Sequence, residues 1–325
     1  MHHIATFSSP ALLSAIDTFL QIDDRSSIGP SRDGRRFNEV VAAVHGLCAA
    51  LISEEQAGAR RADIVRMLEP VRAIHGRSAF LARLQQWPRG YPGDFETIEY
   101  LWQGRNTAAD RTSFYLEHYA LTAPVAEQHR HKIRRQAQLM MNVLDRTGHI
   151  VNLACGSVPD LRLVAEVAPD KLGSLRTGAS SILLSDMDQA ALDYAATALG
   201  PTARLCRFQA GHALRVLRKL DRPADLVLIG GLFDYLSERA CAAIVRAAAE
   251  RLADGGTLFF TNIGQGNPYR PWLEYCGEWT LIERTESDVR DLVDRCGVPM
   301  DVEVSRDTTG LTLLVTAVRR GGSLQ

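Results

Sequence analysis

Residues 151–160, VNLACGSVPD, have the pattern of a ligand-binding turn between a strand and a helix. The apolar run ends near Ala154, Gly156 marks a tight turn, and Pro159 suits the first turn of a helix. A dinucleotide-binding loop needs three glycines, because the pyrophosphate must reach the helix N-terminus closely. A loop with one glycine lets a ligand approach the backbone at Gly156 without forming a phosphate cradle. Another nucleotide ligand stays open as an alternative.

A second group of chemically useful residues follows the next two predicted strands. Asp186 ends the run SILLSD, where a carboxylate can accept hydrogen bonds from both hydroxyls of a ribose; the alternative is an ordinary acid at a strand end. Asp188 is expected to cap the following helix. Gly211-His212-Ala213 forms a later loop, in which His212 can contact an adenine or lie in solvent.

Strand and helix patterns alternate after residue 148, which positions these loops at one edge of a sheet. The predicted strands are 149–154, 181–186, 204–209, 224–231, 257–263, 300–307 and 311–318. Apolar residues recur through the first five, most continuously in 224–231, as in parallel sheets covered on both faces. The last two are joined by Thr-Thr-Gly, a hairpin-like connection. We therefore expect a mixed α/β sheet of seven strands with an antiparallel last strand.

The first part of the chain shows only helical patterns. Ser9-Pro10 is a helix start, and amphipathic patterns follow at 37–56, 62–76 and about 124–146, with a polar loop at 24–35. We expect residues 1–125 to form a helical lid domain and residues 126–325 to form the ligand-binding domain.

Composition narrows the function classes. The 325 residues are 46% apolar and 23% charged, with a net charge of -1, which gives no reason to expect nucleic acid or an acidic membrane as a partner. The six cysteines form no CxxC pair, and no apolar run reaches about 20 residues. We expect a cytoplasmic enzyme of small molecules, either a monomer or a homodimer.

The motif and the sheet together resemble the class I S-adenosylmethionine-dependent methyltransferases, whose Rossmann-like sheet has an antiparallel seventh strand. NLACGSVPD is similar to the first motif of that family, except that Asn152 replaces an acidic residue and Val158-Pro159 replace the last glycine. The resemblance implies S-adenosylmethionine as cofactor, with no metal. It implies a cofactor site made by Ala154, Cys155, Gly156, Asp160, Asp186, Met187, Gly211, His212, Ala213, Gly230 and Leu232.

Four further segments resemble one subgroup of that family. They are RGYPGDFETIEYLW (89–102), GLFDYL (231–236), NPYRPWLEYCGEWTLIERT (267–285) and RDTTGLTLLV (306–315). The subgroup includes methyltransferases of 3-hydroxy fatty acid methyl ester biosynthesis, which implies methyl transfer to a small-molecule carboxylate, amine or hydroxyl in secondary or signal metabolism. A weaker resemblance to azetidine-2-carboxylate synthases implies an alternative, cyclisation of the cofactor with release of methylthioadenosine. A cofactor-binding partner protein without turnover is a third possibility.

Several residues of these segments are candidates for the reaction centre. Tyr91 can cover the sulfonium by a cation–π contact or only form a turn, and Asp94 can hold the cofactor ammonium or only cap a helix. Phe233 and Tyr235 are expected to wall the reaction centre beside Asp234, which is either a base or a helix-start acid. The predicted catalytic residues are Tyr91, Phe233 and Tyr235, and the predicted substrate-binding residues are Asp94, Tyr115, Arg134, Asn262, Arg270, Glu274 and Tyr275.

The basic segment HRHKIRRQ, residues 129–136, is expected to be a solvated helix face. Arg130 and Arg134 share one side of that helix and can reach an acidic substrate, and Arg270 can clamp a carboxylate or be a surface residue. His129 and His131 point in different directions on a helix and are not expected to bind a metal. Both candidate reactions are displacements at a carbon bonded to a sulfonium, so alignment and exclusion of water suffice.

Overall fold

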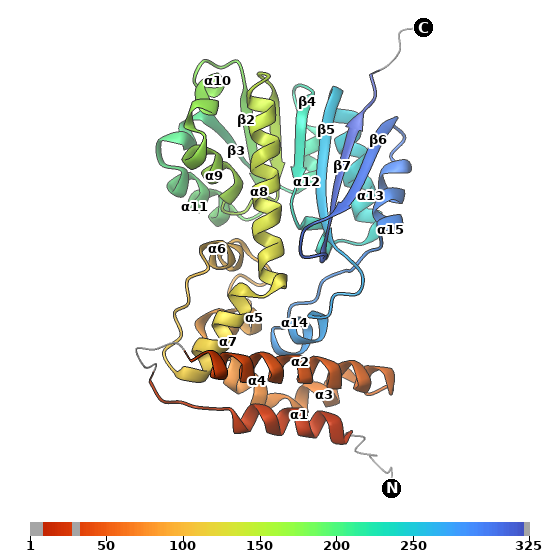
Figure 1. Ribbon diagram of the computed structural model, residues 1–325. Helices are drawn as coiled ribbons and strands as arrows, with labels where there is room; N and C mark the ends of the chain where they lie inside the picture. The colour runs from red at the N-terminus through yellow and green to blue at the C-terminus, as the bar shows by residue number, and fades with distance from the viewer. Residues whose placement is uncertain (1–8, 28–32, 322–325) are drawn as a thin grey trace. The chain divides into compact units, whose positions relative to one another are not determined.

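A computed structural model describes residues 9–27 and 33–321, so part of the predicted polar loop 24–35 lies outside the described residues. The described chain forms two compact units. Unit 1 contains the residues up to Ala126 together with Pro268–Thr280, and unit 2 contains Glu127–Asn267 and the chain from Leu281 onward (Figure 1). The sequence did not indicate that Pro268–Thr280 returns to the helical unit.

Unit 1 is built from helices. They are α1 (Pro10–Gln21), α2 (Gly34–Gln56), α3 (Arg61–Met67), α4 (Glu69–His75), α5 (Ala79–Gln86), α6 (Phe95–Gln103), α7 (Arg111–Thr122) and α14 (Arg270–Cys276). The predicted start of α1 is confirmed, because the Ser9 side chain accepts a hydrogen bond from the Leu12 amide. The predicted helix 62–76 is divided after Met67, because Pro70 in the first turn of α4 has no amide hydrogen to continue α3.

Helix α2 is the one helix among the described residues that is long and apolar enough to cross a membrane by length and composition. In the structure it is a core helix of unit 1, with Val44, Leu47 and Leu51 fully buried. Of its most apolar window, 44% is buried inside the structure.

Unit 2 contains a seven-stranded sheet with the order β3-β2-β1-β4-β5-β7-β6. The strands are β1 (His149–Leu153), β2 (Ser181–Asp186), β3 (Cys206–Ala210), β4 (Ala224–Ile229), β5 (Leu252–Ile263), β6 (Met300–Arg306) and β7 (Thr312–Arg319). Strand β7 runs antiparallel to β5 and β6, and the other pairings are parallel. The mixed sheet predicted from the sequence is confirmed, although β5 begins five residues before the predicted 257.

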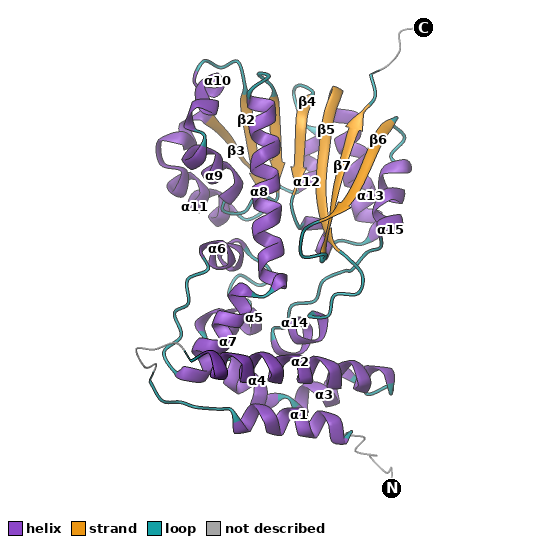
Figure 2. Ribbon diagram, viewed as in Figure 1, coloured by secondary structure: helices purple, strands orange, loops and turns teal. Residues whose placement is uncertain are grey.

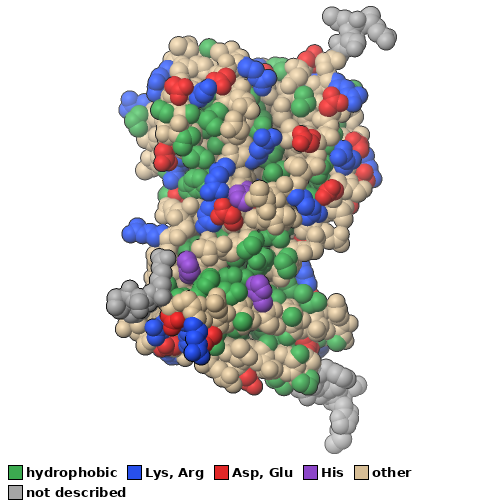
Figure 3. Space-filling model, in the orientation of Figure 1, with side chains coloured by type: hydrophobic (Ala, Val, Ile, Leu, Met, Phe, Trp, Pro, Cys, Tyr) green, Lys and Arg blue, Asp and Glu red, His purple; other side chains and the backbone are tan. Residues whose placement is uncertain are grey.

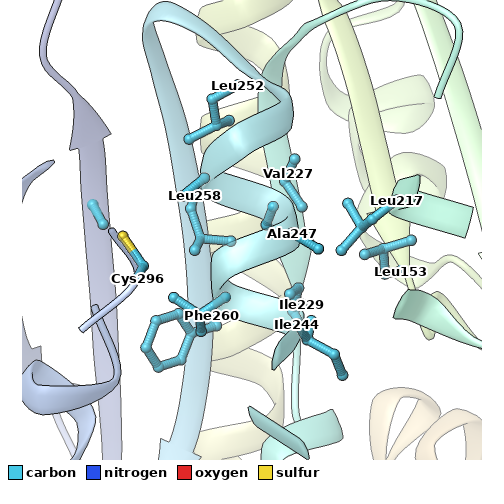
Figure 4. Packing of buried hydrophobic residues seen from close by; sticks show 14 of the residues in the cluster. Leu153, Leu217, Val227, Ile229, Ile244, Ala247, Leu252, Leu258, Phe260 and Cys296 are labelled. Carbon is cyan, nitrogen blue, oxygen red and sulfur yellow. The ribbon is translucent and has the colours of Figure 1, made fainter. Parts of the chain in front are cut away.

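Helices cover both faces of this sheet (Figure 2). They are α8 (Pro124–Leu144), α9 (Pro159–Val167), α10 (Gly173–Arg176), α11 (Gln189–Leu199), α12 (Ala213–Arg218), α13 (Glu238–Arg251) and α15 (Glu286–Asp294), with 3-10 turns η1 (Pro169–Leu172), η2 (Gly200–Leu205) and η3 (Leu232–Tyr235). Alternate strand residues face opposite cores. Val227 and Phe260 pack with α12, α13 and α15 (Figure 4), whereas Leu226 and Phe259 pack with α8, α9 and α11.

The surface of the protein carries charges of both signs. On the face shown in Figure 3, the acidic and basic side chains of the described residues are interspersed. This agrees with the net charge of -1 and a pI near 6.8.

Candidate functional site

The loop between β1 and α9 has an unusual backbone. Ala154, Gly156 and Val158 have φ angles of 50°, 54° and 49°, in the left-handed region. A β-branched residue rarely adopts this conformation, which costs about 1–3 kcal/mol. The Val158 side chain is fully buried and belongs to the core on the α8 side of the sheet, which offsets that cost. The loop therefore has a glycine-like backbone conformation at Val158.

Cys155 lies inside this loop and is buried. Burial raises the pKa of its thiol well above the usual range, and the negative charges of Asp186 and Asp160 raise it further. The thiol is therefore protonated and is not a nucleophile at neutral pH.

Asp186 connects three loops at the end of β2. Its Oδ2 accepts a hydrogen bond from the Gly156 amide at 2.9 Å, and its Oδ1 accepts one from the Asp188 amide at 3.0 Å. Its backbone oxygen accepts a bond from the Gly211 amide at 2.9 Å. Burial raises the pKa of Asp186, whereas the amide hydrogen bonds oppose that rise. The structure thus brings together three positions that the sequence analysis assigned to one cofactor: Gly156, Asp186 and Gly211.

Residues around Asp186 differ in exposure. Met187 is 65% exposed, which is rare for a large apolar side chain in this protein. Asp188 caps α11, as predicted, because its side chain accepts a bond from the Ala190 amide. His212 is exposed at the start of α12 and Ala213 is half-buried. An exposed apolar side chain beside the carboxylate offers a flat ligand such as adenine a surface to cover.

A buried polar network lies below the loop. Oδ2 of Asp160 accepts hydrogen bonds from Gln136 at 2.8 Å and from Asn152 at 2.9 Å. Oδ1 of Asn152 is buried and has no hydrogen-bond partner among the described residues. Burial raises the pKa of Asp160 to about 6, against the opposing effect of its hydrogen bonds. Asn152 at the end of β1 and Asp160 in the first turn of α9 are thus joined by a buried hydrogen bond.

The turn after β4 requires a correction. Gly230 and Leu232 are half-buried, and Gly231 has a φ of 87°. Phe233 was predicted to wall the reaction centre, but it is fully buried and contacts the Phe260 ring at a centroid distance of 4.9 Å. The positive φ at Gly231 turns the chain, so the Phe233 side chain enters the core. Tyr235 is half-buried at the end of η3.

The same turn is held in place by two buried charged residues. Asp234 is 5% exposed, and its Oδ1 accepts a hydrogen bond from the Ile263 amide at the end of β5. Arg284 donates hydrogen bonds to the backbone oxygens of Phe233 and Leu236. Asp234 lies in the first turn of η3, which agrees with the predicted helix-start acid. The sequence analysis missed Arg284, because its partners lie about 50 residues away.

Asn262 lies inside the core of unit 2. It was predicted to bind substrate, but it is fully buried. Its amide nitrogen donates to the backbone oxygens of Ile263 and Ile282, and its amide oxygen accepts from Arg284. Because each end of its side chain is bonded inside unit 2, we assign Asn262 a structural role.

The basic segment of α8 is not uniformly solvated. Gln128, Lys132 and Gln136 lie four residues apart on one side of the helix and are 2–8% exposed. Gln128 accepts a hydrogen bond from Thr312 at 2.6 Å, and a Cβ on Gly230 would stand 2.1 Å from Oε1 of Gln136. The sequence analysis missed this buried polar row, and its four-residue spacing was the signal that could have revealed it.

Arg134, on another side of α8, is 52% exposed at its side chain and pairs with Glu127 at 2.9 Å. Arg130 pairs with the same carboxylate at 2.8 Å. Both arginines are paired with Glu127, and their predicted reach toward an acidic substrate stays a prediction.

The predicted substrate residues of α14 form a closed network within unit 1. Arg270 pairs with both Glu55 and Glu274, and Tyr275 donates its hydroxyl hydrogen to Glu55 at 2.8 Å. Each charged group has an internal partner, so a substrate carboxylate is not needed to balance Arg270. We therefore assign Arg270, Glu274 and Tyr275 a structural role.

The GYPGD segment is a turn between α5 and α6, as predicted. Asp94 is 2% exposed, caps α6 by accepting from the Glu96 and Thr97 amides, and pairs with Arg83 at 2.7 Å. The capping alternative is thus confirmed, and the predicted ammonium-binding role is replaced by these contacts. Tyr91 is half-buried in that turn.

Tyr115 was predicted to bind substrate, but it is 4% exposed. Its hydroxyl oxygen accepts a hydrogen bond from the Asp33 amide at 2.7 Å, just before α2. Tyr115 therefore joins α7 to the start of α2, and we assign it a structural role. Among the described residues, no group of three or more His, Cys, Asp or Glu is arranged to hold a metal ion.

No protein-family model matches this chain, and no curated protein matches it. The crystal structure of a possible exported protein from Bordetella parapertussis is similar over 96% of this chain and 95% of that chain, with a TM-score of 0.53 and 16% identity. This likeness shows a common fold alone.

Solved methyltransferases match smaller shares of the chain. Magnesium protoporphyrin IX methyltransferase from Synechocystis PCC 6803, with bound S-adenosylhomocysteine, is 12% identical over 60% of this chain and 87% of that chain, with a TM-score of 0.44. The N-methyltransferase NodS from Bradyrhizobium japonicum WM9 is 14% identical over 58% of this chain and 97% of that chain, with a TM-score of 0.40. The strand order β3-β2-β1-β4-β5-β7-β6 and the antiparallel β7 define the fold independently of these likenesses. Unit 2 has the class I methyltransferase fold.

Proposed function

We propose that the protein binds S-adenosylmethionine at the ends of β1, β2 and β3 and transfers its methyl group to a small-molecule acceptor. The observation that carries this proposal is the position of Asp186, whose carboxylate joins the Gly156 loop to the start of α11. Ligands of open α/β sheets bind at this edge of the sheet.

The residues at this edge fit the parts of the cofactor. Each oxygen of Asp186 accepts one backbone hydrogen bond and keeps a further lone pair for a ribose hydroxyl. Met187 and the loop from Gly211 to Ala213 border the adenine. The backbone at Gly156 lies beside the methionyl portion.

The cofactor supplies a methyl group that is already activated by the sulfonium charge. The protein then has to align the acceptor with that carbon and exclude water, which competes as a nucleophile. Tyr91 and Tyr235 remain proposed contributors to the reaction centre. The role of unit 1 as a lid and the cytoplasmic location remain proposals as well.

Incubation with S-adenosylmethionine labelled at the methyl carbon tests this function. Cell extract metabolites serve as the acceptor mixture, and products are separated by mass spectrometry. Methyl transfer is supported by S-adenosylhomocysteine together with label on an extract compound. Labelled methylthioadenosine and azetidine-2-carboxylate, formed without extract above the protein-free rate, would replace the proposal with cofactor cyclisation. Binding without either product would indicate a cofactor-binding partner protein.

A further inference from the structure

Lys132 is a buried cation on the polar row of α8. It is 6% exposed, and within residues 9–27 and 33–321 it makes no hydrogen bond or ion pair. An ammonium has three hydrogen-bond donors, and a buried charge without acceptors is costly. Among the described residues, the Lys132 ammonium therefore has no acceptor for its hydrogens.

The surroundings of Lys132 place it at the turn after β4. Its Nζ lies 3.2 Å from the point where a Cβ on Gly231 would stand, and Oδ2 of Asp234 lies 3.7 Å from the same point. The sheet order puts β4 on the side of β1 opposite to β2, which carries Asp186. Lys132 is therefore displaced from the proposed ribose position toward the half of the sheet where an acceptor would meet the cofactor.

Nearby carboxylates balance part of this charge without bonding to it. Burial lowers the pKa of Lys132, and the negative charges of Asp234 and Asp307 oppose that effect. Asp307 is already bonded to His131 at 2.8 Å and to the Thr312 amide at 3.0 Å. These bonds explain why the Asp307 pKa is lowered although its burial would raise it.

His129, on the same helix, does not compete with Lys132 for an anion. Burial lowers its pKa well below the usual range, and the charge of Lys132 lowers it further, so its imidazole is neutral at pH 7. Lys132 is thus the cation next to Gly231 whose donors are uncommitted.

We propose that Lys132 binds a carboxylate of the reacting small molecules beside Gly231. This inference rests on the proposed function and specifies the chemistry that the site recognises. An anionic oxygen is the strongest acceptor for a buried ammonium, because the hydrogen bond is charge-assisted. The carboxylate belongs either to the methionyl portion of the cofactor or to the acceptor, which makes the acceptor an acid in the second case.

The first experiment observes Lys132 directly. Lys132, Lys171 and Lys219 are the lysines of the sequence, so protein labelled at lysine Cε with ¹³C gives a simple spectrum. Lys132→Arg assigns the resonance. We expect it to titrate at a lower pH than Lys171 and to shift upon addition of S-adenosylhomocysteine or of benzoate. The proposal is overturned if neither ligand changes the Lys132 resonance or its titration.

The second experiment separates the two sources of the carboxylate. Lys132→Met removes the charge, Lys132→Arg keeps it, and Lys171→Met is the matched control, since Lys171 pairs with Asp145 and lies away from the polar row. If the cofactor carboxylate binds, Lys132→Met weakens S-adenosylhomocysteine about 10- to 100-fold and leaves methylthioadenosine, which lacks that carboxylate, unchanged. If Lys132 binds the acceptor carboxylate, Lys132→Met weakens the binding of benzoate by the same factor in cofactor-saturated protein. The binding of benzamide, which has no carboxylate, is then unchanged.

These results also distinguish the inference from the proposed function. Wild-type protein that does not bind S-adenosylhomocysteine contradicts the proposed function. Wild-type protein that binds it, with Lys132→Met equal to Lys171→Met for both ligands, contradicts the role of Lys132 alone.

Discussion

The amide of Gly156 donates a hydrogen bond to Oδ2 of Asp186 across 2.9 Å. This bond couples the turn after β1 to the end of β2. A carboxylate that only closed a strand end would not need to reach the neighbouring loop, and a loop with one glycine gains a fixed geometry from it. The two features that the sequence presented separately are parts of one site.

The first prediction concerns the ribose. Asp186→Ala would also remove the acceptor of the Gly156 amide hydrogen bond, so a loss of affinity in that variant alone would not identify a ribose contact. The ligand is therefore varied together with the residue. An S-adenosylhomocysteine analogue without ribose hydroxyls should bind wild-type protein about 1.5–3 kcal/mol more weakly, because hydrogen bonds to a charged acceptor are lost. In Asp186→Asn the penalty for the same analogue should be smaller. Equal penalties in a calorimetric double cycle would remove Asp186 from the ribose site.

The second prediction concerns the contact between Gly230 and Gln136. A Cβ on residue 230 would stand 2.1 Å from Oε1 of Gln136, so Gly230→Ala must displace that amide from Asp160. We expect a loss of about 1–3 kcal/mol in the free energy of unfolding. Combining Gly230→Ala with Gln136→Ala should cost less than the sum of the single changes. Strict additivity in urea denaturation would show that the two residues are not in contact.

The third prediction is a pH dependence caused by Asp160. Its pKa is about 6 in the folded protein, above the ordinary value near 3.9, so the folded state holds this proton more tightly than the unfolded state. Stability from this group is therefore complete below about pH 4 and is lost as pH rises to about 6, by about 3 kcal/mol. Asp160→Asn should abolish that part of the profile. The control is Asp170→Asn, at an exposed position. If the unfolding free energy of Asp160→Asn depends on pH in the same way as that of wild type, the assignment to Asp160 is contradicted.

The fourth prediction separates structure from ligand binding at Asp94. Asp94→Ala removes a helix cap and a buried partner of Arg83, and should destabilise the protein by about 2–4 kcal/mol. Asp188→Ala removes a cap alone and should cost about 1 kcal/mol. The affinity of Asp94→Ala for S-adenosylhomocysteine should equal that of wild type. A large loss of affinity for S-adenosylhomocysteine would show that Asp94 contributes to cofactor binding.

The sequence was sufficient for features that depend on local patterns. Apolar runs with intervening helices predicted the parallel strands, and Thr-Thr-Gly predicted the antiparallel turn between β6 and β7. Cap residues are also local, so Ser9 and Asp188 were predicted correctly. The order of the strands was not predicted, because strand periodicity alone does not give the neighbours of a strand.

The sequence was insufficient where a side chain meets a distant segment. Phe233 has the composition of a pocket wall, but the turn at Gly231 directs it into the core. Arg270 has the composition of a carboxylate clamp, but Glu55, 215 residues earlier, satisfies it. The burial of Lys132 was not predicted, because the net charge of the basic segment does not show which of its residues face the sheet.

A crystal structure grown with S-adenosylhomocysteine tests the central claim most directly. The account predicts the ribose hydroxyls within hydrogen-bond distance of the Asp186 carboxylate, the adenine against Met187 and the amino-acid portion beside Gly156. S-Adenosylhomocysteine bound elsewhere, or with its ribose away from Asp186, would contradict it.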